Sequence, residues 1–581
     1  MNFKIKSWIL ITALMMPLFF FAQKPAAPVR NIAEFEPMQG VIVRYPFGIP
    51  TSLVKEMADV VTVTTLVSSD WQKNTVKNAY QQAGVNMSNI DFITVNTDSY
   101  WTRDYSPWFI VDGNDEFGVV DFTYNRPRPN DNKALKTIAE AMGLNYYCMD
   151  LKHTGGNYMT DGYGTSASTS LVLTENSTLS LSDIEQEVND YLGITNYMLF
   201  QDPMDDYIEH IDCWGKFLDV DKVLIGEVPQ SDYRYADYEA TAQAFASATS
   251  SWGNNYQVYR VYSPGCTSIN NDVTPYTNSL ILNDRVFVAQ TGSDWDAAAI
   301  ATYQQAMPGY TIVPVQESAS TPWENTDALH CRTHEIPDLG MLSIHHYPLL
   351  GTKPYQPHYP FTAEITAYSG QSLIADSVVA YYQVDTAQWQ MMKLQNTGGK
   401  TWAGSFDSLP ANAQVKYYLS AQDMSGRHEK HPYIGAADPH IFTIGAAPDS
   451  IGNPVDSTIV NPIDTSDLPP VNIDSTLVDS THTDSIPTPP INTDSLSISN
   501  LHSISYYTVY PNPATGYFTI AGDVISDIYI YNVYGQLVDE RKNCVRNAVR
   551  IFTDGWPSGV YFVKVINPRG DSVIRKVVIK R

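Results

Sequence analysis

The chain has 581 residues, of which 43% are hydrophobic and 17% are charged. It is too long for one ordinary domain, and about two to four are expected. Its 36 Lys and Arg residues stand against 62 Asp and Glu residues, which gives a formal net charge of −26. Because a nucleic-acid or anionic-membrane partner would need a basic face, this balance argues against both kinds of partner.

Residues 1–22 are typical of a secretory signal peptide. Lys4 and Lys6 give a basic start, and an apolar run from Trp8 to Ala22 follows. This run is short for a membrane span, and no later segment is long and apolar enough to be one. We therefore expect an exported protein without a membrane span, and an uncleaved anchor is the alternative.

Cysteine usage argues against a disulfide framework. The chain has five cysteines, an odd number, and they form no CxxC pair: Cys148, Cys213, Cys266, Cys331 and Cys544. At least one thiol is therefore left unpaired. We expect Cys148, Cys213 and Cys266 to be small buried hydrophobic side chains. For Cys331, the local sequence allows a nucleophile, a metal ligand, half of a disulfide or a buried thiol.

Residues 23–358 combine helical and strand patterns and are expected to form a mixed α/β domain. A polar cluster that leads into an apolar strand, a turn and a second strand recurs along this region. Repeats of hairpin plus helix predict a pseudosymmetric toroid or propeller, whose polar clusters could meet at one axis. The individual predictions are helices at 130–143, 180–193 and 296–309 and strands at 40–45 and 60–67.

Three further segments follow this domain. Residues 359–445 alternate apolar and polar side chains, and an immunoglobulin-like β-sandwich is expected there. Residues 446–504 are rich in Asp, Ser and Pro and contain no aromatic residue, so they are predicted to be an extended linker. Residues 505–581 show short alternating strands separated by turns, which predicts a small β domain.

The last segment also carries specific motifs. "YPNP" (510–513), "NVYGQLV" (532–538) and "GVYFVKV" (559–565), ahead of a basic terminus, resemble the C-terminal sorting domain of the type IX secretion system. This resemblance implies export across an outer membrane, with the type IX secretion machinery as a partner. The protein would then be secreted or attached to the cell surface.

Polar clusters of the α/β region hold side chains suited to nucleophilic chemistry. Cys331 offers a thiolate nucleophile, and His210 can protonate a leaving group and then activate water. Asp104 and Asp212 suit a planar cation with several N–H donors, because each carboxylate accepts two hydrogen bonds. His210 and Asp212 would share one side of an extended chain. The set fits attack on a guanidinium carbon better than attack on an amide carbonyl.

Five motifs, in this order, resemble one family: "EFEPMQGVIVRYP" (34–46), "WTRDYSPWF" (101–109), "GGNYMTDGYG" (155–164), "HIDCWGKFLD" (210–219) and the Cys331 segment. The family is that of the bacterial peptidylarginine and agmatine deiminases, guanidino-group-modifying enzymes with a fivefold α/β propeller. The resemblance implies that Cys331 attacks the guanidinium, that His210 protonates the departing ammonia, and that Asp104 and Asp212 hold the nitrogens. It gives Asn278 the role of supporting Cys331, citrulline as the product, and no cofactor.

Substrate choice is expected to depend on Arg126 and Arg128, which would point to the same side of an extended chain. Agmatine has no carboxylate, whereas a peptide ending in arginine has one that a guanidinium fork can bind. We expect arginine-containing peptides and proteins as partners, especially those with C-terminal arginine, and Trp101 and Tyr207 beside the aliphatic stem. Alternatively, both arginines lie on the surface, one of them paired with Asp131.

Three other interpretations stay open. His330 and His334 could bind zinc if they lay on a helix, but Pro337 limits a helix there and no HExxH motif is present, so we expect no metal. An agmatine deiminase is the enzymatic alternative. A non-catalytic surface binding protein on the same fold is the third possibility, and it would be consistent with the β domains and the sorting tail.

Overall fold

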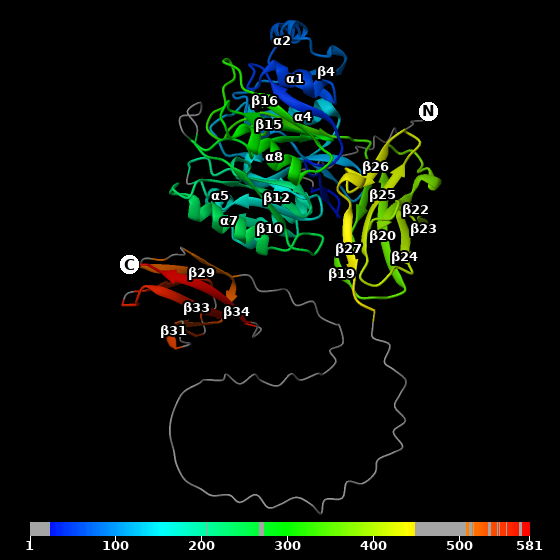
Figure 1. Cartoon of the computed structure of the whole chain (residues 1–581). Helices are drawn as coiled ribbons and strands as arrows, with labels where there is room; N and C mark the ends of the chain where they lie inside the picture. Colours follow the sequence, from blue (N-terminus) through cyan, green and yellow to red (C-terminus); the bar gives the residue numbers. More distant parts are fainter. Residues whose placement is uncertain are drawn as a thin grey trace, which may run out of the picture. The chain divides into compact units, whose positions relative to one another are not determined.

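The computed structural model describes most of the chain (Figure 1). The described residues are 24–204, 206–265, 272–447, 507–510, 514, 516–532, 536–542, 544, 546–553, 555–568 and 572–580. The expected signal peptide, Cys266 and almost all of the expected linker lie outside them. The chain divides into two units, Met1–Ser450 and Ile451–Arg581. No helix of the described residues is long and apolar enough to cross a membrane.

The α/β part of the first unit contains five separate sheets among the described residues, and all five repeat one pairing order. Each sheet has an antiparallel strand pair followed by a parallel pair. In sheet order the strands are β1 (Arg30–Asn31), β5 (Trp108–Val111), β6 (Phe117–Tyr124) and β7 (Asn145–His153); β10 (Asn196–Phe200), β9 (Thr165–Thr169) and β8 (Met159–Thr160); β11 (Gly215–Asp219), β12 (Lys222–Glu227) and β13 (Gln257–Tyr262); β14 (Leu280–Leu282), β15 (Arg285–Gln290) and β16 (Thr311–Gln316); and β17 (His334–Pro337), β2 (Met38–Arg44), β3 (Thr62–Val67) and β4 (Ile90–Thr94).

Helices connect the parallel strands of each sheet, because such strands need a crossover connection. The connecting helices are α1 (Thr51–Ala58), α2 (Asp70–Ala83), α4 (Asp131–Met142), α5 (Leu171–Glu175), α6 (Leu181–Leu192), α7 (Tyr235–Ser247) and α8 (Asp296–Ala306). A further short helix, α3 (Thr102–Tyr105), lies between two sheets, and the 3-10 turns are η1 (Met87–Asn89), η2 (Gly155–Asn157) and η3 (Ile211–Cys213). The three predicted helices are confirmed as α4, α6 and α8, and the two predicted strands as β2 and β3.

Local sequence explains where a helix such as α6 begins and ends. Ser180 accepts a hydrogen bond from the backbone of Asp183, whose carboxylate accepts one from the Ser180 backbone in return. This capping box satisfies amides that the first helical turn leaves free. Gly193 ends the helix at φ 70°, a left-handed conformation that costs glycine little. A side chain there would also meet the carbonyl oxygen of Val29, 1.9 Å from an added Cβ.

The fifth sheet joins the two ends of the α/β part. β17, which follows Cys331, pairs antiparallel with β2, with His334 opposite Ile42. The segment that carries Cys331 is thereby fixed against the first long strand of the domain. The repeated pairing confirms the α/β class, while no pairing within the described residues closes the sheets into one barrel. The arrangement of the five sheets around one axis stays a prediction.

A two-sheet β region completes the first unit. Its sheets, in strand order, are β18 (Leu342–His346), β20 (His358–Ala367), β24 (Thr401–Asp407) and β23 (Gln395–Gly398); and β19 (Gly351–Lys353), β27 (His440–Ile444), β25 (Gln414–Gln422), β21 (Val379–Val384) and β22 (Gln390–Lys393), with β26 (His428–His431) beside β25. Short turns η5 (Ala375–Ser377) and η6 (Gly435–Ala437) lie between strands. Both sheets contribute to one hydrophobic core. Because β18 and β19 pair with later strands, this region begins before the boundary expected after residue 358.

This β region packs against the α/β part through polar contacts. The Arg427 guanidinium binds both oxygens of Asp338, at 2.6 and 2.7 Å. His431 Nε2 lies 2.8 Å from the hydroxyl of Tyr163, and His345 stacks on the same ring. These contacts cross from the loops and strands of the β region to residues of the α/β part, so the two share one folded unit.

The second unit is a small all-β body. Its strands, in sheet order, are β28 (Tyr507–Tyr510), β29 (Tyr517–Ile525) and β32 (Arg546–Phe552); and β31 (Leu537–Arg541), β30 (Asp527–Asn532), β33 (Gly559–Ile566) and β34 (Ser572–Ile579). Buried side chains such as Phe518, Ile530 and Val563 form its own core. It has the strand-rich character expected for residues 505–581.

Two truncations test this division of the chain. A chain ending at residue 447 should melt as the full protein's first unit does, because it keeps every strand of that unit. A chain ending at residue 358 leaves β18 without β20 and exposes Leu342 and Ile344, which are 1% and 7% exposed in the intact unit. Its melting temperature should be at least about 5 °C lower. Thermal unfolding followed by circular dichroism measures this, and equal melting temperatures would contradict the strand pairing.

Candidate active site

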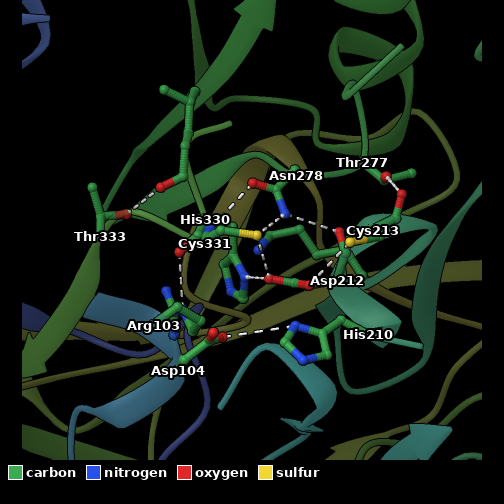
Figure 2. Close-up of polar contacts among 12 residues, drawn as sticks. Arg103, Asp104, His210, Asp212, Cys213, Thr277, Asn278, His330, Cys331 and Thr333 are labelled. Carbon is green, nitrogen blue, oxygen red and sulfur yellow. Dashed lines mark hydrogen bonds and ion pairs between the residues drawn. The ribbon is translucent and has the colours of Figure 1, made fainter. Parts of the chain in front are cut away.

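The antiparallel strand pair of each α/β sheet has a short polar segment directly before one of its strands. The segments are α3 before β5, η2 before β8, η3 before β11, residues 277–279 before β14 and residues 330–333 before β17. Contacts join four of them: Asp104 lies near His210, Asn278 and Asp212 both contact Cys331, and the backbone N–H of Arg103 donates to the Cys331 carbonyl at 3.2 Å. Side chains of these four segments therefore meet at one place, as Figure 2 shows.

Cys331 is the centre of this cluster and is 5% exposed. Asn278 Nδ2 donates to its Sγ at 3.1 Å, and the thiol donates to Asp212 Oδ2 at 3.4 Å. The Oδ1 of Asn278 accepts the backbone N–H groups of Cys331 and Ala328 at 3.2 and 3.0 Å. One amide side chain thus fixes both the backbone turn and the direction of the thiol.

The pKa of the Cys331 thiol is raised well above its ordinary value. The largest cause is its contact with the Cys213 thiol, and burial and the Asp212 carboxylate act in the same direction. Without a ligand the thiol is therefore protonated at neutral pH. A cation bound beside it would favour the thiolate, because opposite charge lowers the pKa of an acid.

Asp212 is a buried carboxylate at the end of a chain of hydrogen-bonded side chains. His330 Nδ1 lies 2.7 Å from Asp212 Oδ2, and His330 Nε2 lies 3.1 Å from Glu34 Oε2. Lys216 donates to the same Glu34 oxygen at 2.5 Å. Burial acts to raise the pKa of Asp212, but the hydrogen bond and charge of His330 outweigh it and the pKa is lowered. Asp212 therefore stays ionised in the interior.

Asp104 and His210 face each other with unused binding capacity. Asp104 Oδ1 lies 3.7 Å from His210 Nδ1, and Tyr124 donates to Asp104 Oδ2 at 3.0 Å. Within the described residues, neither Asp104 Oδ1 nor His210 Nε2 has a hydrogen-bond partner, although both are buried. Buried polar atoms are almost always paired, so these two indicate where a ligand binds.

Two glycines of η2 make room for this pair. A Cβ on Gly156 would lie 2.5 Å from His210 Nδ1 and 2.9 Å from Asp104 Oδ1. A Cβ on Gly155 would lie 2.0 Å from the carbonyl oxygen of Arg103. The "GG" of the third motif is thus required by the close approach of three segments.

Arg103 and Glu335 form a buried ion pair beneath the cluster. Arg103 Nη1 and Nη2 donate to the two Glu335 oxygens at 3.0 and 2.5 Å, and Arg103 Nε donates to the His330 carbonyl at 3.3 Å. The pair connects α3 to β17 and so fixes Asp104 relative to Cys331. Sequence reasoning did not single out Glu335, Glu34 or Lys216. Their signal was a charged residue beside or within an apolar strand.

The four residues expected to contact substrate form two pairs by ring contacts. The Arg128 guanidinium lies 4.2 Å from the ring of Trp101, and Arg128 Nη1 donates to the Tyr124 hydroxyl at 2.8 Å. The Arg126 guanidinium lies 5.9 Å from the ring of Tyr207, which is 82% exposed. Tyr124 links Arg128 directly to Asp104.

Two segments do not have the extended backbone for which side chains two residues apart would share one side. The segment of Arg126 and Arg128 is bent, because the Arg128 N–H donates to the Arg126 carbonyl at 2.8 Å. His210 precedes the 3-10 turn η3 and Asp212 lies within it, so they do not lie on an extended strand. The turn nevertheless directs Asp212 at Cys331 and His210 at Asp104.

The remaining cysteines and histidines have mixed outcomes. Cys213 is buried as expected, whereas Cys148 is exposed because it lies on the outward side of β7. Both nitrogens of His330 face carboxylates, and His334 Nε2 lies 2.8 Å from the Pro107 carbonyl. These two histidines do not lie on a shared helix, since His334 begins β17.

Replacing Glu335 by Gln tests the buried ion pair. Arg103 would keep its charge in the interior without a matching carboxylate, which costs roughly 3–5 kcal/mol of unfolding free energy. Urea unfolding measures the change. Glu140→Gln is the matched control, because Glu140 is exposed on α4 and its substitution should change stability by less than about 0.5 kcal/mol. Equal stability of the two variants would contradict the role of the pair.

Two parts of the chain match known protein families. Residues 508–580 match the secretion system C-terminal sorting domain, which indicates export. The curated agmatine deiminase of Ectopseudomonas mendocina (strain ymp) is 25% identical over 304 residues, 46% of this chain and 80% of that protein.

A solved structure, agmatine deiminase of Enterococcus faecalis catalyzing its reaction, matches with 23% identity and a TM-score of 0.47, over 53% of this chain and 96% of its own. The family model for Porphyromonas-type peptidyl-arginine deiminase matches residues 30–337, more than half of the sequence and all five polar segments. The chain therefore belongs to the Porphyromonas-type peptidyl-arginine deiminase family.

Proposed function

We propose that the protein is an exported deiminase that hydrolyses the guanidinium group of arginine, preferentially C-terminal arginine of peptides, to citrulline and ammonia. The observation that carries the proposal is the meeting of Cys331, Asp212, Asp104 and His210 from four separate segments. Family membership and the five sheets with one repeated pairing order support it.

The geometry supports a covalent mechanism. The guanidinium binds between the carboxylates of Asp104 and Asp212, and its charge favours the Cys331 thiolate beside it. The thiol proton leaves to solvent as the thiolate forms, and Sγ then bonds to the guanidinium carbon and gives a tetrahedral adduct. His210 protonates the departing ammonia through Nε2, which leaves a thiouronium. The same nitrogen then takes a proton from water, whose oxygen replaces sulfur to give citrulline.

The preference for a C-terminal arginine rests on Arg126 and Arg128, of which Arg128 is linked to Asp104 through Tyr124. Arg128 stacks on Trp101, and Arg126 lies over exposed Tyr207. In the part of the chain that the structure describes, neither Arg126 nor Arg128 is hydrogen-bonded to Asp104 or Asp212, so both can bind a carboxylate of the substrate. Their surface alternative with Asp131 has less support, because Asp131 accepts from the hydroxyl of Ser99 at 2.7 Å.

Agmatine is the second candidate substrate. The curated relatives named agmatine deiminase, 25–26% identical, favour it. A non-catalytic binding protein is the third reading, and the buried Cys, His and two Asp argue against it because an unused set would leave unpaired polar groups inside the fold. The sorting domain supports delivery by type IX secretion machinery to the medium or the cell surface.

A colour assay for citrulline on a peptide ending in arginine tests the activity. Asp212→Asn should lower turnover by about two to four powers of ten, because a charge-paired contact worth roughly 3–5 kcal/mol is lost. Cys331→Ala should give no colour, and both variants should remain folded. Asp237→Asn, at an exposed position of α7, is the control with unchanged turnover. Near-normal turnover in Asp212→Asn would refute the assignment.

Arg126→Ala tests the substrate preference without touching Asp104, because Arg126 contacts Tyr207 rather than Tyr124. The KM for a peptide with a free C-terminal arginine should rise about 10- to 100-fold, as expected for a lost charge-assisted hydrogen bond. The KM for agmatine and for the same peptide as a C-terminal amide should change less than about threefold. Equal changes for all three substrates would show that Arg126 does not read the carboxylate.

A further inference from the structure

The proposed reaction leaves one thiol of the site without a role. Cys213 is reduced, 3% exposed and next to Asp212 in η3. Its Sγ lies 3.7 Å from Asp212 Oδ1, while Cys331 Sγ lies 3.4 Å from Asp212 Oδ2. Two thiols thus converge on one carboxylate from opposite oxygens. Among the described residues, this trio is the group of Cys, His, Asp and Glu whose ligand atoms all lie within 4.8 Å of one another.

We propose that Asp212, Cys213 and Cys331 form a binding site for a thiophilic divalent cation, such as Zn²⁺ or Cd²⁺, at the position of the substrate guanidinium. Two thiolates and a carboxylate are a ligand set that such ions prefer. In a tetrahedral zinc site with bonds of about 2.3 Å to sulfur and about 2.0 Å to oxygen, sulfur and oxygen lie about 3.5 Å apart. Each sulfur lies near that separation from one oxygen of Asp212: Cys331 Sγ is 3.4 Å from Oδ2, and Cys213 Sγ is 3.7 Å from Oδ1.

The surroundings hold each ligand in place. His330 Nδ1 orients the Asp212 carboxylate, and Asn278 Nδ2 orients the Cys331 sulfur. The hydroxyl of Thr277 donates to the Cys213 carbonyl at 2.7 Å and so fixes the turn that carries this thiol. Such outer partners set the geometry of metal ligands. The protein does not have to rearrange to bring the three ligand atoms together.

Charge also favours a cation at this point. Asp104 Oδ1 is buried and has no hydrogen-bond partner within the described residues, so it can accept a further contact from a cation. When the ion binds, the two thiol protons leave to solvent and two metal–sulfur bonds form. Three protein ligands leave a fourth position for water, unlike closed structural sites with four protein ligands. We therefore expect an ion that a chelator can remove.

Inhibition follows from the shared ligands and rests on the proposed function. Cys331 and Asp212 cannot bind the ion and the substrate at the same time. The ion should therefore compete with C-terminal arginine peptides, and a chelator should restore turnover.

Cadmium titration of the full chain, reduced and kept without oxygen, tests the site. The readout is the ultraviolet charge-transfer absorption of Cd²⁺ bound to thiolate, which does not depend on activity. The parent protein should show a saturable band at one equivalent. Cys213→Ser should weaken binding by more than the roughly 10- to 100-fold that loss of an outer partner costs. Cys148→Ser, which removes an exposed thiol, is the matched control and should bind as the parent does.

Each outcome decides one part of the proposal. A parent protein without the band, or a band of equal strength and affinity in Cys213→Ser, would overturn the site. Inhibition by Cd²⁺, expressed relative to each variant's own activity without the ion, should weaken in Cys213→Ser in parallel with binding. If binding is lost in Cys213→Ser but the parent turns over unaffected by bound Cd²⁺, the site stands and the overlap with substrate is wrong. Absence of any deiminase activity would instead count against the proposed function.

Discussion

The buried carboxylate of Asp212 is the interaction on which the site depends. An ionised carboxylate in the interior is expensive unless it is paired and hydrogen-bonded. Here the pairing is a chain of hydrogen-bonded groups, from Lys216 through Glu34 and His330 to Asp212. These residues come from three distant parts of the sequence. The buried carboxylate is paired only when all three parts are in place, which couples the chemistry of the site to the stability of the α/β part.

The state of Cys331 depends in part on that carboxylate. Contact with the Cys213 thiol, burial and the Asp212 carboxylate all raise the pKa of the Cys331 thiol, so the site lacks a strong nucleophile until a cation binds. A bound cation supplies the missing positive charge and favours the thiolate. The same electrostatics select the ligand: a guanidinium or a metal ion is attracted, while a neutral amide gains nothing. Protection of the thiol before binding and its activation afterwards are thus two results of one charge arrangement.

Sequence reasoning found Asp104, His210, Asp212, Asn278 and Cys331 because each lies in a motif that repeats ahead of an apolar hairpin, and the structure brings all five together. It also found the α/β class and the main helices, whose periodicity and caps are local. It missed the partners of Asp212 and the Arg103–Glu335 pair, since such pairs join residues far apart in the chain and a single charge in a strand names no partner. The same-side placement stated for an extended chain does not apply at the Arg126 and His210 segments, because both segments are turns.

The residues proposed to react with the guanidinium are buried, whereas Arg126 and Tyr207, expected to contact the rest of the substrate, lie at the surface. Cys331, Asp212 and Asn278 are fixed by buried contacts between rigid elements, so their geometry tolerates little change. Arg126 and Tyr207 lie on a bend and a loop with exposed surface, where substitutions leave the core intact. Tyr124 links Arg128 to the buried residues, because its hydroxyl accepts from Arg128 and donates to Asp104. A substrate carboxylate bound to Arg128 would therefore change the hydrogen bond that Tyr124 donates to Asp104. Through this contact, binding of the substrate carboxylate can adjust the position of the Asp104 carboxylate, which is proposed to hold the guanidinium.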